Sequence, residues 1–139
     1  MPKTRSMRSK RNKTVSKRSN IDKQITVYFM EMLMMVKLFH WKTHSFATHK
    51  ATDELYDSLN EHIDNFIEVF LGKMGSRINL TQKKSISLVD LNSQTSLKGR
   101  IDKFKHFLEG LPDFGSDIMN IRDEILGDLN KFLYLLTFK

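Results

Sequence analysis

Cysteine is absent from the 139 residues of this chain. Its absence excludes a disulfide scaffold, a zinc site built on thiolates and a cysteine nucleophile. No apolar run approaches the roughly 18 residues of a membrane span, and the N-terminus lacks an apolar signal core. A glycine-rich phosphate loop is missing, and no serine stands in the context of a nucleophile elbow. We therefore expect an intracellular protein that is not secreted, does not enter a membrane, and has its chemistry in imidazole and carboxylate groups.

Acidic residues are absent from the first twenty positions, although the whole chain holds 16 of them. The other 15 basic residues nearly balance those acids, so the net charge of +7 comes from the N-terminal arm. The basic residues of the arm are Lys3, Arg5, Arg8, Lys10, Arg11, Lys13, Lys17 and Arg18. With little to bury, residues 1–20 are expected to be disordered in isolation. Such an arm suits sequence-independent contact with DNA phosphates, and a solubilising tail or a nuclear-import signal is the alternative.

Apolar residues recur at helical spacing over the rest of the chain, and no segment shows sustained strand alternation. We predict helices over 21–42, 46–71, 96–110 and 115–137, the first capped by Asn20 or Asp22. The apolar island at 86–91 predicts a short extra helix in the long crossover between the second and third helices. The expected fold is all-α, a four-helix bundle over residues 21–139.

Four side chains on the predicted second helix form the most specific pattern. His49 and Asp53 make one i,i+4 pair, and Asp64 and Glu68 make another. All four fall within a stripe roughly 100° wide, but about 28 Å of helix axis separates His49 from Glu68. One metal ion cannot bind both pairs on one helix. In two antiparallel copies of the helix, the His49/Asp53 pair of one copy would face the Asp64/Glu68 pair of the other. This arrangement predicts a metal site shared across a two-fold dimer.

An ordered series of residues surrounds this stripe. Its members are Asp22-Lys23-Gln24, Val36-Lys37-Leu38-Phe39-His40-Trp41, Phe46, His49, Asp53-Glu54-Leu55-Tyr56, His62-Ile63-Asp64 and Glu68. The series resembles the Dps proteins, the small DNA-protecting members of the ferritin superfamily. The resemblance implies a ferritin-like bundle in which His40, His49 and Asp53 are ligands from one subunit. It makes Asp64 and Glu68 ligands from the two-fold partner, and it places Trp41 beside the site with the interception of radicals as its implied role.

The resemblance implies a ferroxidase-type oxidoreductase of oxidative stress that binds, oxidises and sequesters iron at a dinuclear-type site. Imidazole and carboxylate ligands also suit zinc or manganese. The expected partners are further copies of the chain, in a dimer or a larger shell, and non-specific DNA in a nucleoid, nucleus or virion. The alternative is a non-catalytic DNA-condensing or particle-structural protein on the same bundle. His62 is interpreted as an exposed helix residue, and Glu124 and Asp128 as part of a solvated face.

Overall fold

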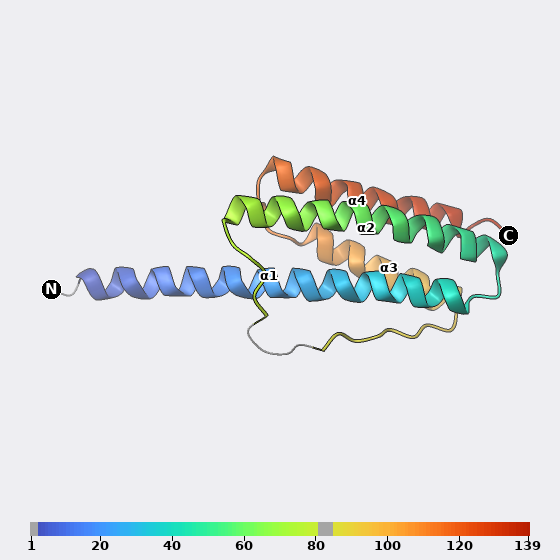
Figure 1. Ribbon diagram of the computed structural model, residues 1–139, viewed down its shortest axis with the longest axis horizontal. Helices are drawn as coiled ribbons and strands as arrows, with labels where there is room; N and C mark the ends of the chain where they lie inside the picture. Colours follow the sequence, from blue (N-terminus) through green and yellow to red (C-terminus); the bar gives the residue numbers. More distant parts are fainter. Residues whose placement is uncertain (1–2, 81–84) are drawn as a thin grey trace.

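The computed structural model describes residues 3–80 and 85–139, with side chains from residue 21 onward within these ranges. It contains four helices: α1 (Lys3–Lys42), α2 (Phe46–Met74), α3 (Gln94–Glu109) and α4 (Ser116–Leu135). Figure 1 shows two helical hairpins, α1–α2 and α3–α4, joined by a long link that passes along α1. The described residues contain no strand. The predicted all-α helical bundle is therefore confirmed.

Serine and glycine mark several helix ends. The Ser45 hydroxyl accepts a hydrogen bond from the Thr48 N–H at the start of α2, and Ser93 caps α3 through the Ser96 N–H in the same way. Gly75 ends α2 in the left-handed conformation, with its N–H bonded to the Leu71 carbonyl. Gly115 precedes α4 at φ +105°, a conformation that disfavours residues with a Cβ. These local signals place α2, α3 and α4 within three residues of their predicted bounds.

The start of the first helix differs from the prediction. α1 begins at Lys3 and runs through Asn20 and Asp22 without a break, so neither residue is its N-cap. Its N-terminal part extends past the other three helices (Figure 1). The sequence from Lys3 to Lys42 contains neither proline nor glycine, and its many lysines and arginines have good helix propensity. A helix nucleated in the bundle can therefore continue into residues that have nothing to bury.

The predicted short helix at 86–91 is wrong. Residues 85–92 are described without helix, and they run as an extended link. The Ser87 N–H donates to Glu31 Oε1 at 3.0 Å, and Lys42 contacts Asp90. Two side chains of α1 therefore hold the link at two points. Serine alternates with Ile86 and Leu88 in this stretch, a pattern that fits an extended chain better than a helix. The apolar island lies along α1 instead of making its own helical turn.

One core joins the four helices. α2 packs against both α1 and α4, and α3 packs against α4. Phe29 of α1 and Phe66 of α2 meet edge to face at 5.3 Å between ring centroids, and both rings are almost fully buried. Tyr28 of α1 stacks on Phe107 of α3 at 4.1 Å. The core thus fixes α2 in the middle of the bundle, with α1 on one side and α4 on the other. No helix in the described part of the chain has the length and hydropathy required to cross a membrane.

Phe66→Ala tests this core. Phe66 is 0% exposed, so its truncation should lower the free energy of unfolding by about 3–5 kcal/mol through lost transfer energy and a cavity. Met30→Ala is the control, because Met30 is 48% exposed and should cost less than about 1 kcal/mol. Denaturant unfolding followed by circular dichroism measures both. Equal losses in the two variants would contradict this core.

Candidate functional site

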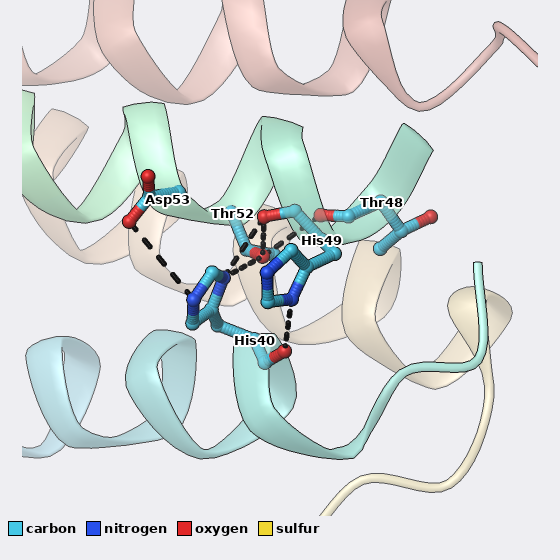
Figure 2. Close-up of polar contacts among 5 residues, drawn as sticks. All are labelled: His40, Thr48, His49, Thr52 and Asp53. Carbon is cyan, nitrogen blue, oxygen red and sulfur yellow. Dashed lines mark hydrogen bonds and ion pairs between the residues drawn. The ribbon is translucent and has the colours of Figure 1, made fainter. Parts of the chain in front are cut away.

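His40 and His49 form a reciprocal pair where α1 ends and α2 begins. His40 Nδ1 lies 2.9 Å from the His49 carbonyl oxygen, and His49 Nδ1 lies 2.9 Å from the His40 carbonyl oxygen. The two rings are stacked, with centroids 3.9 Å apart and planes 17° apart (Figure 2). The short connection between α1 and α2 brings these residues together, because only residues 43–45 separate the helices.

The hydrogen bonds determine which ring nitrogen carries the proton. A carbonyl oxygen only accepts, so Nδ1 must be the protonated nitrogen in each ring. Nε2 of each neutral imidazole then carries a lone pair. A backbone carbonyl that holds one ring nitrogen while the other remains available is the usual arrangement around metal-binding histidines. The buried Thr52 hydroxyl lies 3.2 Å from His40 Nδ1 and donates to the Thr48 carbonyl. Its contact with Nδ1 further restrains the His40 ring.

Asp53 lies one turn further along α2, beside His40. Its Oδ1 is 3.9 Å from His40 Nε2. The His40 side chain is 11% exposed and that of Asp53 is 55% exposed. The two side chains therefore extend from a buried imidazole to a carboxylate on the surface. Figure 2 shows the Asp53 carboxylate facing the Nε2 side of the His40 ring. The structure therefore brings His40, His49 and Asp53 into one small region.

Trp41 follows His40 at the end of α1. It is 69% exposed, and Lys37 Nζ lies 6.0 Å from its ring centroid. The same Lys37 Nζ lies 4.5 Å from the Tyr56 ring centroid on α2. The Trp41 side chain thus lies on the surface in the single chain, adjacent in sequence to His40.

Asp64 and Glu68 are exposed on α2 and lie away from this group. Asp64 lines a groove between α1 and α2 together with Met30, Leu33 and Ile67. In the part of the chain that the structure describes, no three histidine or acidic side chains are close enough together to bind one metal ion. A single subunit therefore presents two separate polar groups. One consists of His40, His49 and Asp53, and the other consists of Asp64 and Glu68.

A histidine on α2 has a role that the sequence interpretation missed. His62 Nδ1 lies 2.5 Å from Asp128 Oδ2, and His62 Nε2 lies 3.6 Å from Glu124 Oε2. The side chains of His62 and Asp128 are only 27% and 15% exposed. Glu124 and Asp128 stand at i,i+4 on α4, so both carboxylates lie on the face that meets α2. That spacing was visible in the sequence, but the pairing of α2 with α4 was not.

The two carboxylates change the acid–base behaviour of His62. Burial by itself would lower the pKa of His62, but the hydrogen bond to Asp128 and the charges of Asp128, Glu124 and Glu61 raise it above 6.5. Burial likewise raises the pKa of Asp128, and the hydrogen bond from His62 opposes this shift only in part. Both shifts mean that the folded protein binds protons more tightly than the unfolded chain.

The side chains of the arm residues fall outside the described ones. They are Lys3, Arg5, Arg8, Lys10, Arg11, Lys13, Lys17 and Arg18, whose backbone belongs to α1. Their contact with DNA therefore stays a prediction from the sequence.

Comparison with known proteins places the chain in a family. No curated protein and no solved structure matches it. A family of unknown function, DUF5856, matches residues 40–136. The chain belongs to this family. The DUF5856 segment begins at His40 and includes His49, Asp53, Asp64 and Glu68. The basic arm precedes the DUF5856 segment.

The His62 contacts predict a pH dependence of folding. Since the pKa of His62 is raised in the folded state, its contribution to stability is complete below pH 6.5 and is lost as the pH rises through the folded-state pKa. In the presence of a chelator, the free energy of unfolding of the wild type should fall from pH 6.5 upward. His62→Gln should flatten this dependence. His106→Gln is the control, because the His106 side chain is 81% exposed. A wild-type slope that His62→Gln leaves unchanged would refute the assignment.

Proposed function

We propose that the chain forms a two-fold dimer that binds and oxidises Fe(II) at a dinuclear-type site shared between its subunits. The observation that carries the proposal is the His40–His49 pair, whose backbone hydrogen bonds engage Nδ1 of both rings and leave Nε2 out of these bonds. The Asp53 carboxylate lies beside His40 Nε2. Two imidazole nitrogens and a carboxylate are ligands that suit Fe(II).

The second copy supplies the missing carboxylates. The centre of the His49/Asp53 pair and the centre of the Asp64/Glu68 pair are about 22 Å apart along α2 at 1.5 Å per residue. Two α2 helices can pack antiparallel with the two-fold axis near Tyr56 and Asn60. The His49/Asp53 pair of each subunit would then face the Asp64/Glu68 pair of the other. An isologous contact of this kind creates two equivalent sites.

The surface of the α1–α2 hairpin supports this dimer. The groove that Asp64 lines also contains Met30 and Ile78, and these side chains are 48% and 40% exposed. Leu33 and Ile67 complete its apolar lining. A partner subunit covering this face would bury apolar surface as it supplies its carboxylates, which is favourable at about 25 cal/mol per Å².

Iron is the substrate in this proposal, and peroxide is the oxidant. Each of two Fe(II) ions gives one electron to a hydrogen peroxide molecule, whose O–O bond breaks. Two hydrogen ions from the solvent then complete two water molecules, and two Fe(III) ions remain. His40 and His49 would hold the ions through Nε2, while Asp53 and the partner subunit's Asp64 and Glu68 would balance their charge. Trp41, exposed next to His40, would intercept radicals that escape.

The proposal includes a ferritin-like arrangement of the bundle and DNA binding by the basic arm, as the resemblance to Dps proteins implies. Retention of Fe(III) by an oligomer bound to DNA would keep Fe(II) and peroxide from reacting beside the DNA. The second candidate function is a DNA-condensing or particle-structural protein without catalysis. It shares the arm and the dimer, so iron turnover is what distinguishes the two functions.

A complementation experiment tests the shared site. His49→Ala/Asp53→Ala destroys one half-site and Asp64→Ala/Glu68→Ala destroys the other, so neither homodimer should oxidise Fe(II) above background. When the two variants are unfolded together and refolded at equal amounts, about half of the dimers should be mixed, and each mixed dimer has one of its two sites intact. The mixture should recover about one quarter of wild-type peroxide-dependent oxidation, followed by Fe(III) absorbance.

Asp102→Ala/Glu109→Ala, which removes two exposed carboxylates of α3, is the matched control and should retain wild-type rates. Full loss in both homodimers without recovery on mixing would refute a site shared across the two-fold axis. Background rates in the wild type would refute the iron-oxidising function and favour the structural alternative.

Salt dependence tests the arm. With all eight basic residues of the arm engaged, the log–log slope of DNA affinity against salt would approach about −7 by counterion release. Replacing Lys10, Arg11, Lys13 and Lys17 with glutamine should weaken DNA binding and reduce the slope by about half. The control replaces the same number of basic residues on α3, Lys98, Arg100, Lys103 and Lys105, and reaches the same net charge. Equal effects of the two sets, measured by fluorescence anisotropy, would contradict binding by the arm.

A further inference from the structure

A cavity lies at the end of the bundle where α1 enters it, α2 ends and α4 begins, opposite to the end that holds His40 and His49 (Figure 1). Its volume is about 800 Å³, within the range of roughly 300–1,000 Å³ that is typical of small-molecule sites. Three segments line it, which are α1 near residue 21, the end of α2 with the link after it, and the connection between α3 and α4. None of the proposed iron ligands is in this lining.

Most of the wall of this cavity is apolar. Phe70 of α2 and Phe114 of the α3–α4 connection meet edge to face, with ring centroids 5.0 Å apart. The apolar residues of the lining are Ile21, Phe70, Met74, Ile78, Pro112 and Phe114. Such a wall of aliphatic and aromatic side chains suits the apolar body of a ligand, because both surfaces leave water on binding.

Lys73, at the edge of the cavity, already has its own counter-ion. Its Nζ donates to the Phe114 carbonyl at 2.7 Å and to Asp117 Oδ1 at 2.9 Å. The hydrogen bond from Lys73 lowers the pKa of Asp117, so the carboxylate of this pair is ionised at neutral pH. A Cβ at Gly115 would overlap Lys73 Nζ, so the glycine leaves room for the lysine. Lys73 therefore joins α2 to the α3–α4 connection and fixes one side of the cavity.

Arg77 is the cation that remains available to a ligand. It is exposed, and its Nη1 donates to the Ser76 carbonyl at the long distance of 3.4 Å. Within residues 21–80 and 85–139, no acidic side chain pairs with it. A guanidinium binds a carboxylate through two parallel hydrogen bonds. Cations also outnumber acids in the lining, which contains Lys23, Lys73 and Arg77 against Asp22 and Asp113.

We propose that this cavity binds a free amphipathic carboxylate of the fatty-acid class. The acyl chain packs against Phe70, Met74 and Phe114, and the carboxylate binds the Arg77 guanidinium. The unpaired charge of Arg77 favours a carboxylate over a neutral lipid, and the apolar wall favours an acyl chain over a small hydrophilic anion. The site lies at the other end of the bundle from the proposed iron site and does not depend on it.

Calorimetric titration of the full chain with sodium decanoate tests the proposal. The wild type should show a single saturable site. Arg77→Gln should bind decanoate about tenfold or more weakly, because it loses hydrogen bonds to a charged group. Met74→Gln should bind about fivefold or more weakly, because it places an amide against the acyl chain. Arg100→Gln removes an arginine of α3 outside the cavity and should bind as the wild type does.

Decanol, which has the same chain without the charge, separates the two parts of the ligand. It should bind equally to the wild type and Arg77→Gln, and more weakly to Met74→Gln. Far-UV circular dichroism verifies the fold of each variant, and Arg77 is exposed in the link after α2, so its replacement leaves the core intact. Ile78 also lines the groove of the proposed dimer, so none of the variants changes it.

Two results would overturn the proposal. One is the absence of saturable decanoate binding, or a decanoate affinity that is the same in the wild type, Arg77→Gln and Met74→Gln. The other is a dimer that Met74→Gln dissociates in size-exclusion chromatography while decanoate does not compete with it, which would assign the cavity to a second copy of the chain. Neither result bears on Fe(II) oxidation, which is measured separately.

Discussion

The pair of reciprocal hydrogen bonds between His40 and His49 connects the fold of this protein to its proposed chemistry. Each imidazole donates to the backbone carbonyl of the other residue, so the end of α1 and the first turn of α2 are joined twice. These bonds satisfy buried polar groups at a helix junction and also determine the tautomer of both rings. The proposed metal-binding nitrogens are therefore oriented by the α1–α2 hairpin itself, before any ion or second subunit is present.

α2 has a different role on each side. Towards α1 it carries His49, Asp53 and Asp64. Towards α4 it carries His62, which bonds to Asp128, and Glu54, whose Oε1 lies 2.6 Å from Lys131 Nζ. The buried apolar stripe between these polar edges packs α2 against both neighbours. Asp53, Asp64 and Glu68 are exposed beside this stripe, so a second copy can reach them without displacing α1 or α4.

Much of the fold was predictable from local sequence patterns. Apolar spacing located the four helices, and Ser45 and Gly75 stand at the two ends of α2. Two features were not predictable in this way. The helix of α1 continues into the basic arm because no residue between Lys3 and Lys42 breaks it, although the arm has nothing to bury. The island at 86–91 is extended and contacts Glu31 and Lys42 of α1. Local spacing could not predict these contacts, because both partners lie far away in the sequence. The spacing of His49 and Asp53 placed them on one face, but the bonds that fix the two imidazoles depend on the geometry of the turn. His62 was misread for the same reason, since its carboxylates come from α4.

The central claim is that one site takes ligands from two subunits. Anomalous X-ray diffraction at the iron absorption edge, from crystals grown with Fe(II) without oxygen, tests it most directly. The account predicts iron bound to Nε2 of His40 and His49 and to Asp53 of one subunit, with Asp64 and Glu68 of the partner subunit completing the site. Iron bound by one subunit alone, or no iron at these residues in an otherwise ordered dimer, would contradict it.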